Sequence, residues 1–296
     1  IINVNGGKIN IVDDNTKTGY SAIYSTCGAI NMNTVKDEKG NVIGAGNNKV
    51  DITGNIVTSV GAVNYVDCST ETEVNVGLTT KDSKLTGVVY NQFPEGGKTV
   101  SQRGDSKTFT GAANLWLQNG AQWIYENASR KDGLDASNLA DNSRPYYEKY
   151  DGVSHLSSLV GGKDKASAGI IKVNDSDPIH IANAEGVTKV WYEHDDATPG
   201  TIIGGDIKVF NAKTGTEMML YTGNNGISKG FAEGDTAAEK NNVSEVLNSL
   251  AHKLWYMAGD SNLTGSVSIA EGLTASSVTM KTGNITFAEG GQGFYD

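Results

Sequence analysis

The carboxylate side chains are the residues of this chain best suited to acid–base chemistry, and their spacing offers little of it. Asp51 is the centre of an apolar, polar, apolar triplet, whereas the centres of the comparable triplets are the amides Asn10, Asn31 and Asn75. Enzymes that degrade polysaccharides need several carboxylates that converge on one face. A single Asp in a column of Asn is more typical of a side-chain ladder or a sugar-contacting groove. We therefore predict no catalytic residue, and a polysaccharide-degrading enzyme that uses Asp51 stays the alternative.

Three acidic clusters could coordinate a cation through their oxygen atoms. They are Asp13-Asp14-Asn15, Asp175-Ser176-Asp177 and Glu193-His194-Asp195-Asp196. None has the spacing of a calcium-binding loop, and the four histidines do not have the spacing of zinc ligands. Turns between strands commonly carry residues of this kind. We predict a solvated turn at each cluster, with no metal ion and no cofactor.

One tetrapeptide has residue types suited to recognition. Arg103-Gly104-Asp105-Ser106 lies in a polar segment, 96–107, in which Val100 is the only large apolar residue. On an exposed loop it presents a guanidinium and a carboxylate, and it is identical to the tetrapeptide of matrix proteins that integrins recognise. Short motifs also arise by chance, so a Gly turn in a solvated loop is the competing interpretation. We predict Arg103, Gly104 and Asp105 as ligand-binding residues.

Exposed aromatic side chains are the second group of candidate binding residues. Tyr146, Tyr147 and Tyr150 lie in a polar run, and Trp191 lies in a strand-like segment. Rings of this kind stack on sugars or fill a pocket of a protein partner. We predict these four residues as ligand-binding, and we expect about half of the aromatic residues in the strand-like segments to face the core.

The elements that must position these residues are short strands. The triplets that begin at Ile9, Ile30, Val50 and Val74 start 21, 20 and 24 residues apart, which is about the length of one coil of a β-solenoid. Alternation of apolar and polar residues turns one face of each strand inward. The 37 Gly, against four Pro, supply turns. We predict an all-β parallel β-helix that forms one unit over 1–296, with regular coils over 1–110.

Three polar stretches interrupt the strand pattern. They are 36–48, 91–108 and 127–154, and each is rich in Gly, Asn or charged residues. Repeat arrays tolerate insertions at the corners of their coils. We predict these stretches as loops that protrude from the solenoid.

One segment has a helical pattern. Over about 243–257, apolar residues recur at helical spacing from Val243 to Leu254, Asn242 precedes them as a capping residue, and Gly259 follows as a stop. We predict a short amphipathic helix over about 243–257. Its apolar face should cover one side or one end of the solenoid.

The two cysteines, Cys27 and Cys68, are 41 residues apart. This is about two of the predicted coils, or roughly 10 Å at ~4.8 Å per coil, and a disulfide needs a Cα separation of about 4.4–6.8 Å. We predict unpaired, small core residues. An insertion between them that closes the gap would permit a disulfide, and this alternative stays open.

Composition excludes two classes of partner. The net charge is −10, and no cluster of Lys or Arg occurs, whereas nucleic-acid binding needs a basic face. The same charge disfavours an anionic bilayer surface. No apolar run approaches the roughly 20 residues of a membrane helix, so we expect no membrane insertion of this chain.

Two segments resemble a known family. The run from Asn114 to Trp123, NLWLQNGAQW, followed by His155-Leu156, resembles a motif of the passenger domains of Gram-negative autotransporter adhesins. The tract from Asn262 to Thr274 is similar to a segment that often follows in long members. This resemblance implies a right-handed parallel β-helix, export by the type V route, and display at the cell surface or secretion. It also implies that the chain is an excised passenger piece, because no carboxy-terminal membrane barrel is visible.

These observations favour one function and leave two alternatives open. The favoured function is a non-catalytic adhesin that binds a glycan or protein on host or neighbouring bacterial cells, or its own copy, and so promotes aggregates or biofilm. The first alternative is the polysaccharide-degrading enzyme described above. The second is a passive stalk that holds a distal domain away from the membrane.

Overall fold

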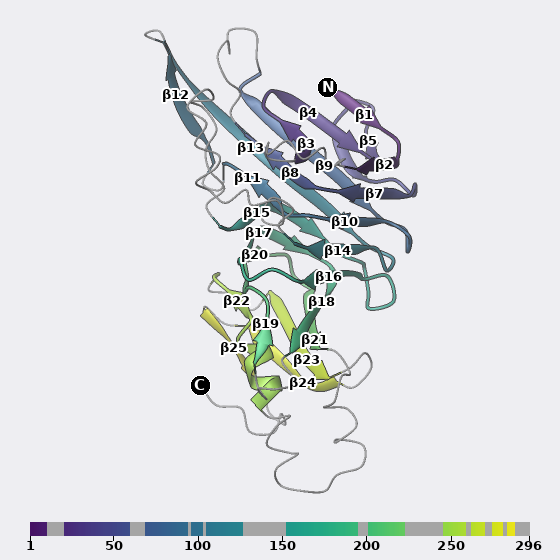
Figure 1. The fold of residues 1–296 in the computed structure, drawn as a ribbon, viewed down its shortest axis with the longest axis vertical. Helices are drawn as coiled ribbons and strands as arrows, with labels where there is room; N and C mark the ends of the chain where they lie inside the picture. Colours follow the sequence, from purple (N-terminus) through teal and green to yellow (C-terminus); the bar gives the residue numbers. More distant parts are fainter. Residues whose placement is uncertain are drawn as a thin grey trace, which may run out of the picture.

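The computed structural model describes residues 1–10, 21–59, 69–93, 96–102, 105–126, 152–194, 201–222, 245–258, 262–269, 274–280 and 283–287. These residues form an elongated stack of β-strands, with the N-terminal strands at one end and the last strands at the other (Figure 1). Most of the strands pair in parallel with the strand before and after them in the stack. The predominance of β-strands and their parallel pairing, both predicted from the sequence, are confirmed.

Eight strands make a first ladder, in which each strand pairs in parallel with the next. They are β1 (Ile2–Val4), β4 (Gly28–Met32), β9 (Glu71–Leu78), β13 (Asp105–Leu117), β15 (Ser154–Val160), β17 (Ile179–Glu185), β20 (Ile207–Ala212) and β22 (Leu254–Tyr256).

Eight further strands make a second ladder, again parallel throughout. They are β2 (Gly7–Asn10), β7 (Val50–Thr53), β10 (Lys84–Thr86), β14 (Gln122–Tyr125), β16 (Gly169–Val173), β18 (Val187–His194), β21 (Thr216–Thr222) and β23 (Leu263–Ile269). Among the described residues, a third and shorter ladder lies near the N-terminal end: β3 (Ser21–Ser25), β8 (Asn55–Thr58) and β11 (Val89–Asn91).

The core lies between the ladders and is built by period-two alternation. In β7, Val50 and Ile52 are fully buried, whereas Asp51 between them is partly exposed. The largest fully buried side chains come from both long ladders, and the three largest, Trp123, Tyr125 and Tyr192, lie in the second. Apolar and β-branched residues therefore form strands here because each strand buries one face against the opposite ladder.

The predicted coil length is wrong. Ile9 pairs with Ile52 in the second ladder, 43 residues on, and Ile30 pairs with Val74 in the first ladder, 44 residues on. Consecutive triplets therefore lie in alternate ladders, and one turn of the chain contains two of them. The turn is also not constant, because Ile171 pairs with Val190 after only 19 residues. The turn shortens where the third ladder has ended and no insertion interrupts the coil.

A close approach of two backbones forms the corner between the second and third ladders. Gly54 donates its N–H to the Thr86 carbonyl at 2.8 Å, and a Cβ at Gly87 would lie 2.3 Å from the Gly54 carbonyl oxygen. Gly87 also has a φ of +153°, which L side chains rarely adopt. Glycine at both positions therefore lets successive coils stack without a gap.

Two of the predicted loops contain antiparallel hairpins. In the 36–48 stretch, β5 (Thr34–Lys36) pairs with β6 (Val42–Ala45). In the 91–108 stretch, β12 (Lys98–Gln102) pairs with the start of β13. Both stretches are therefore ordered by strand pairing, and the hairpin of β5 and β6 packs against β9, where a Cβ at Gly77 would lie 2.7 Å from Ala45 Cβ. The third stretch lies outside the described residues except for its last three, 152–154, the last of which begins β15.

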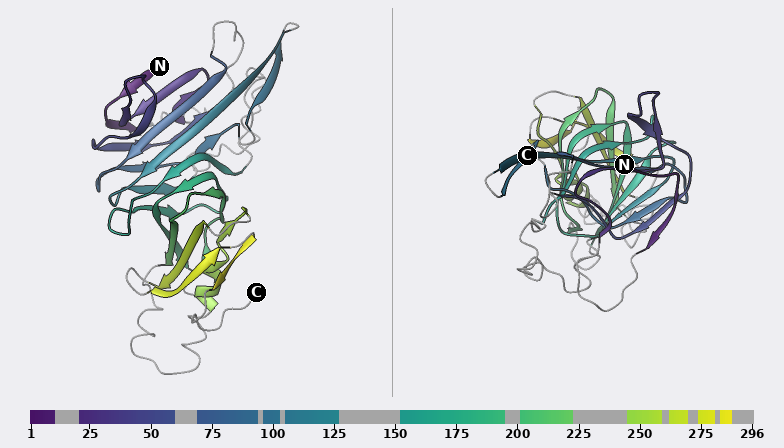
Figure 2. Two further views of the ribbon diagram at one scale, coloured as in Figure 1. Left: turned by 180° about the vertical axis from the view of Figure 1, so that it is seen from behind. Right: turned by 90° about the horizontal axis from the view of Figure 1, so that it is seen from above.

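The C-terminal end of the stack is closed by antiparallel strands. β24 (Thr274–Met280) pairs with β23, and β25 (Gly283–Phe287) pairs with both β24 and β22. Figure 2 shows these strands at the end of the stack that is opposite to the N terminus. A short antiparallel pair also joins β19 (Ile202–Ile203) to β18.

The predicted helix is shorter than expected. It covers 245–251 of the described residues, and its buried residues Val246, Leu247, Leu250 and Ala251 belong to the core. Leu254, which continues the helical spacing, instead begins β22 and pairs with Ile207. Strand pairing with the first ladder therefore ends the helix early. Within the described ranges, no helix has the length and apolar content needed to cross a membrane.

Candidate functional site

The hairpin of β12 and β13 carries the predicted recognition tetrapeptide. Its strands are in register from Lys98 opposite Phe109 to Gln102 opposite Asp105, so Arg103 and Gly104 join two strands that lie side by side. Beyond Phe109, β13 continues into the first ladder and pairs with β9. The hairpin is therefore an extension of a strand of the stack, and it projects from the N-terminal half of the molecule (Figure 1).

The base of the hairpin is anchored in packed structure. Phe109 is 1% exposed and Phe93 is 3% exposed. A Cβ at Gly111 would lie 2.0 Å from the Phe93 ring, which means that this ring lies directly on the backbone of β13. Higher in the hairpin, the hydroxyl groups of Thr99 and Thr108 are 2.8 Å apart across the two strands. Buried rings below and cross-strand hydrogen bonding above hold the hairpin at a fixed angle to the stack.

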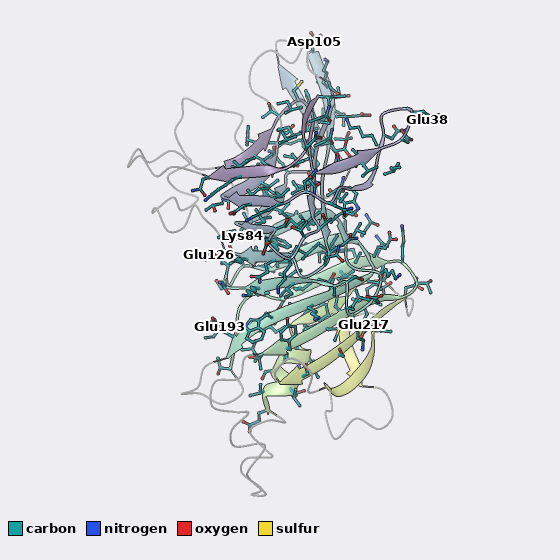
Figure 3. The ribbon with its side chains drawn as sticks, turned by 90° about the vertical axis from the view of Figure 1, so that its right-hand side faces the viewer. Glu38, Lys84, Asp105, Glu126, Glu193 and Glu217 are labelled. Atoms are coloured by element: carbon teal, nitrogen blue, oxygen red, sulfur yellow. The ribbon has the colours of Figure 1, made fainter. Side chains whose placement is uncertain are left out.

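The residues of β13 next to the tip are exposed to solvent. Asp105 and Ser106 are exposed, and Asp105 is the outermost labelled residue at the upper end of the molecule in Figure 3. Arg103 and Gly104 lie outside the described residues. Because Gln102 is opposite Asp105, the carboxylate of Asp105 stands at the first paired position below the tip. Such a carboxylate can accept charge-assisted hydrogen bonds or bind a partner's cation.

Trp191 is the second predicted binding residue that the structure describes. It lies on the outward face of β18, is partly exposed, and contacts Tyr221 edge to face, with ring centroids 4.9 Å apart at 86°. In register with it on β16 is Lys172. An aromatic ring held by a second ring, next to a cationic side chain, can stack on the face of a sugar or of another ring. Tyr146, Tyr147 and Tyr150 lie outside the described residues.

Asp51 does not belong to the column in which the sequence placed it. It lies in the second ladder between Lys8 and Lys84, and the Lys84 ammonium is 3.9 Å from its carboxylate. The next residue of that column is Gln122. Among the described residues of this column, Asp51 therefore has two lysines as charged neighbours and no second carboxylate.

The asparagines form a ladder that the sequence pattern identified only in part. Asn31 donates its Nδ2 to Asn3 Oδ1 at 3.0 Å, Asn75 donates to Asn31 at 2.8 Å, and Asn114 donates to Asn75 at 2.9 Å. Asn31 and Asn75 were predicted as members of one column, whereas Asn10 lies in the second ladder. Two signals could have identified the correct set: the spacing over every second triplet, and Asn114 as the centre of the triplet Ala113-Asn114-Leu115.

Val74 and Val76 belong to the core, so Asn75 between them points to the outer face of the first ladder. It is nevertheless only 1% exposed. The hairpin of β5 and β6 lies against the same strand, since a Cβ at Gly77 would be 2.7 Å from Ala45 Cβ. Each amide in this covered part of the ladder therefore has a partner and little access to solvent, which indicates a structural role.

The acidic clusters differ from the predicted solvated turns where the structure describes them. Asp175 and Asp177 are each 8% exposed, and the Asp177 N–H donates to Asp175 Oδ1 at 3.1 Å. This pair therefore forms a nearly buried turn. Glu193 is exposed, whereas Asp13-Asp14-Asn15, Asp195 and Asp196 lie outside the described residues. Within the described part of the chain, no three His, Cys, Asp or Glu side chains are close enough to share a metal ion.

The cysteine prediction is half correct. Cys27 is a free thiol, but it is exposed rather than packed in the core. It lies in the short connection between β3 and β4. Cys68 lies outside the described residues.

Comparison with known proteins identified no relative of this chain. No family model, no curated protein and no solved structure matches the chain significantly.

Proposed function

We propose that this protein is a non-catalytic adhesion module, in which a rigid β-stack presents a recognition hairpin to the surface of another cell. The observation that supports this proposal is the register of β12 with β13, in which Gln102 pairs with Asp105, so that Asp105 and Ser106 lie at the outer end of the paired strands. In an Arg-Gly-Asp ligand the guanidinium and the carboxylate both have to be accessible to one partner. The exposure of Asp105 and Ser106 supports that requirement.

The scaffold suits this role because recognition loops work best on rigid supports. The hairpin continues directly into β13, which pairs with β9 over eight residues from Thr110 to Leu117. The partner's binding energy is therefore not spent on ordering a long flexible loop. We infer that the stack is a right-handed parallel β-helix displayed at the cell surface or secreted, as the resemblance to autotransporter passengers implies.

The partner class follows from the chemistry of the tip. A guanidinium and a carboxylate separated by one Gly fit a protein receptor that supplies an acidic group and a cationic or metal-bound group. The ligand is thus a surface protein of the integrin type on a host cell. Trp191, with Tyr221 behind it, supports a separate and weaker contact with a surface glycan. Neither contact needs a metal ion or cofactor bound to this chain.

The test is adhesion of integrin-bearing cells to a surface coated with the purified protein. Asp105→Ala should reduce the number of attached cells about tenfold or more, because loss of a central charged contact typically costs about 2 kcal/mol or more. Asp105→Glu should also reduce it, since the extra methylene displaces the carboxylate. The matched control is Asp82→Ala, which removes one exposed carboxylate from a different turn and should leave adhesion unchanged.

Two results would change the assignment. Adhesion that is equal for the wild type and Asp105→Ala would contradict the hairpin as the recognition element. If neither the wild type nor any variant holds cells, a passive stalk is the better description. A competing soluble Arg-Gly-Asp-Ser peptide should release cells from the wild-type surface.

A further inference from the structure

A row of rings runs along the outer face of the first ladder in its C-terminal half. The His155 and His180 rings lie on the neighbouring strands β15 and β17 and contact each other edge to face, with centroids 5.3 Å apart. The Phe210 ring of β20 contacts His180 in the same way, with centroids 5.5 Å apart. These three strands follow one another down one side of the molecule (Figure 1). The rings therefore form a row along the axis of the stack.

The end of this row is exposed apolar surface. Phe210 is 39% exposed and Met257 is 44% exposed. Met257 directly follows β22 and donates its N–H to the Val209 carbonyl at 2.9 Å, so it lies beside Phe210 on the next rung. The preceding residues of the two rungs, Val209 and Tyr256, are fully buried. Strand alternation therefore directs Phe210 and Met257 outward.

Two exposed amides accompany the rings. Asn183 of β17 and Asn211 of β20 are in register. The Asn183 Nδ2 donates to the Ser157 carbonyl at 3.1 Å, and the Asn211 Nδ2 donates to the Ala182 carbonyl at 3.2 Å. Within the described ranges nothing donates to either Oδ1, so both oxygens can accept from a ligand hydroxyl. We call this surface the ring strip: His155, His180, Asn183, Phe210, Asn211 and Met257.

A cation lies beside the ring strip, in a protein whose net charge is −10. Lys208 is the outward residue of β20 next to the row of rings. The carboxylate of Asp206 is 3.5 Å from Lys253 Nζ, and Glu185 at the end of β17 is paired with Lys213. Among the residues that the structure describes, no carboxylate pairs with Lys208. An anionic group of a ligand on the ring strip would therefore meet an ammonium group that has no ion-pair partner.

The repeat of the ring strip suits a polymer of sugar units. Successive rungs are about 4.8 Å apart, which is close to the length of one pyranose unit, and two successive rungs each offer a ring with an amide beside it. Rings stack on the C–H faces of sugars, and amides bind hydroxyl groups. A stable protein interface would need a larger continuous apolar patch than Phe210 and Met257 provide.

We propose that the ring strip binds an acidic polysaccharide whose chain runs along the axis of the stack. Its sugar units stack on the row of rings, and its hydroxyl groups donate to the oxygens of Asn183 and Asn211. A carboxylate of the polysaccharide accepts from the Lys208 ammonium. The ring strip contains neither the hairpin tip nor Trp191, and its role does not depend on the adhesion proposed above.

The probe is a fluorescent oligomer of galacturonic acid, and its fully methyl-esterified form is the matched neutral ligand. Fluorescence anisotropy measures the binding of both to the full chain. The acidic oligomer should bind about fivefold more tightly or better, and the difference should shrink as the salt concentration rises, since salt screens the charges. Equal affinities, or no binding of either oligomer, would overturn the proposal.

Two substitutions locate the site. Lys208→Gln should weaken binding of the acidic oligomer about fivefold and leave binding of the ester unchanged, because only the acid accepts a charge-assisted bond. Phe210→Ala should weaken binding of both oligomers about fivefold, because stacking does not depend on the charge of the ligand. Neither side chain is buried, so both variants should keep the unfolding midpoint of the wild type.

The matched controls lie on the second ladder. Lys172→Gln and Trp191→Ala remove a cation and a ring that are in register there, and both should bind the acidic oligomer like the wild type. Loss of binding in these variants, with Lys208→Gln unaffected, would overturn the location. Asp105→Ala should also bind the oligomer like the wild type, so a failure of cell adhesion and a failure of polysaccharide binding are distinguishable.

Discussion

The two long ladders of this protein are held together by different means. In the first ladder, amide side chains link the rungs along the outer face, and two of these amides, Asn31 and Asn75, are almost completely buried. In the second ladder, the outer face carries exposed or partly exposed groups such as Lys84, Glu126 and Glu193, which Figure 3 shows along one flank. Three large aromatic residues of the second ladder, Trp123, Tyr125 and Tyr192, point inward instead.

This difference indicates which surfaces are available for binding. Directional hydrogen bonds between buried amides specify the register of the first ladder. The part of its outer face that carries these amides therefore has a structural role and is not available to a ligand. The second ladder obtains its stability from inward packing, and its outer face is free to vary. Trp191 on this outer face is accordingly a place where recognition is expected, as is the hairpin, which lies beyond the part of β13 that pairs with β9, whereas the covered amides are not.

The largest effect is expected for an inward aromatic residue of the second ladder. Trp123 is 0% exposed, and its Nε1 donates to the Gly87 carbonyl at 2.8 Å. Trp123→Ala should reduce the free energy of unfolding by about 3–5 kcal/mol. The matched change on the outer face, Trp191→Ala, should cost about 1 kcal/mol, since only one edge-to-face contact is lost. Urea denaturation measures both, and equal costs would contradict the inward–outward distinction.

An intermediate effect is expected in the amide ladder. Asn75→Ala leaves Asn31 Oδ1 without its donor and Asn114 Nδ2 without its main acceptor. Buried polar groups that lose a partner cost about 1–3 kcal/mol. In the second ladder, Asp51→Asn weakens only a long ion pair with a half-exposed lysine and should cost less than about 1 kcal/mol. If the two substitutions cost the same, the amide ladder has no special part in stability.

A small effect at neutral pH, which grows at high pH, is expected at Tyr192, where burial raises the pKa of the phenol well above its usual value. Its hydroxyl donates to the Gly205 carbonyl at 2.9 Å. The folded state thus holds this proton at a pH where the unfolded chain, with a pKa of about 10, releases it. The associated stability is complete below about pH 10 and is lost as the pH rises toward the folded pKa. Urea midpoints measured up to about pH 11 should fall more steeply for the wild type than for Tyr192→Phe.

A flat pH dependence in the wild type would mean that the Tyr192 phenol ionises as easily in the fold as in the unfolded chain. At neutral pH, Tyr192→Phe loses only one hydrogen bond and should cost about 1 kcal/mol.

Sequence patterns predicted the strands well and their partners poorly. Alternation at Val50 to Ile52 and at Val74 to Val76 marks inward and outward residues correctly. However, a triplet near Ile30 can stack on the next triplet or on the one after it, and alternation is the same in both cases. The lengths of the insertions and the number of ladders decide between them, and neither is a property of a single strand.

Tertiary pairing also overrode local patterns at particular residues. Leu254 has helical spacing from the preceding apolar residues, yet it pairs with Ile207 in the first ladder. Cys27 has the small apolar character of a core residue but lies at a corner, exposed. At the candidate site, the polar residues of the 91–108 stretch predicted a protruding loop. They did not predict the hairpin, in which Asp105 pairs with Gln102 of β12.

The most direct test of the two-ladder stack is a disulfide between strands that only this winding brings together. In a chain with Cys27 and Cys68 replaced by Ser, Asn10→Cys with Thr53→Cys joins in-register residues of β2 and β7. Neighbouring parallel strands are about 4.8 Å apart, within the range of a disulfide. We predict rapid oxidation of this pair and none of Asn10→Cys with Asn31→Cys, whose residues lie in different ladders. The reverse result would show that consecutive triplets stack on one another, and it would contradict the fold described here.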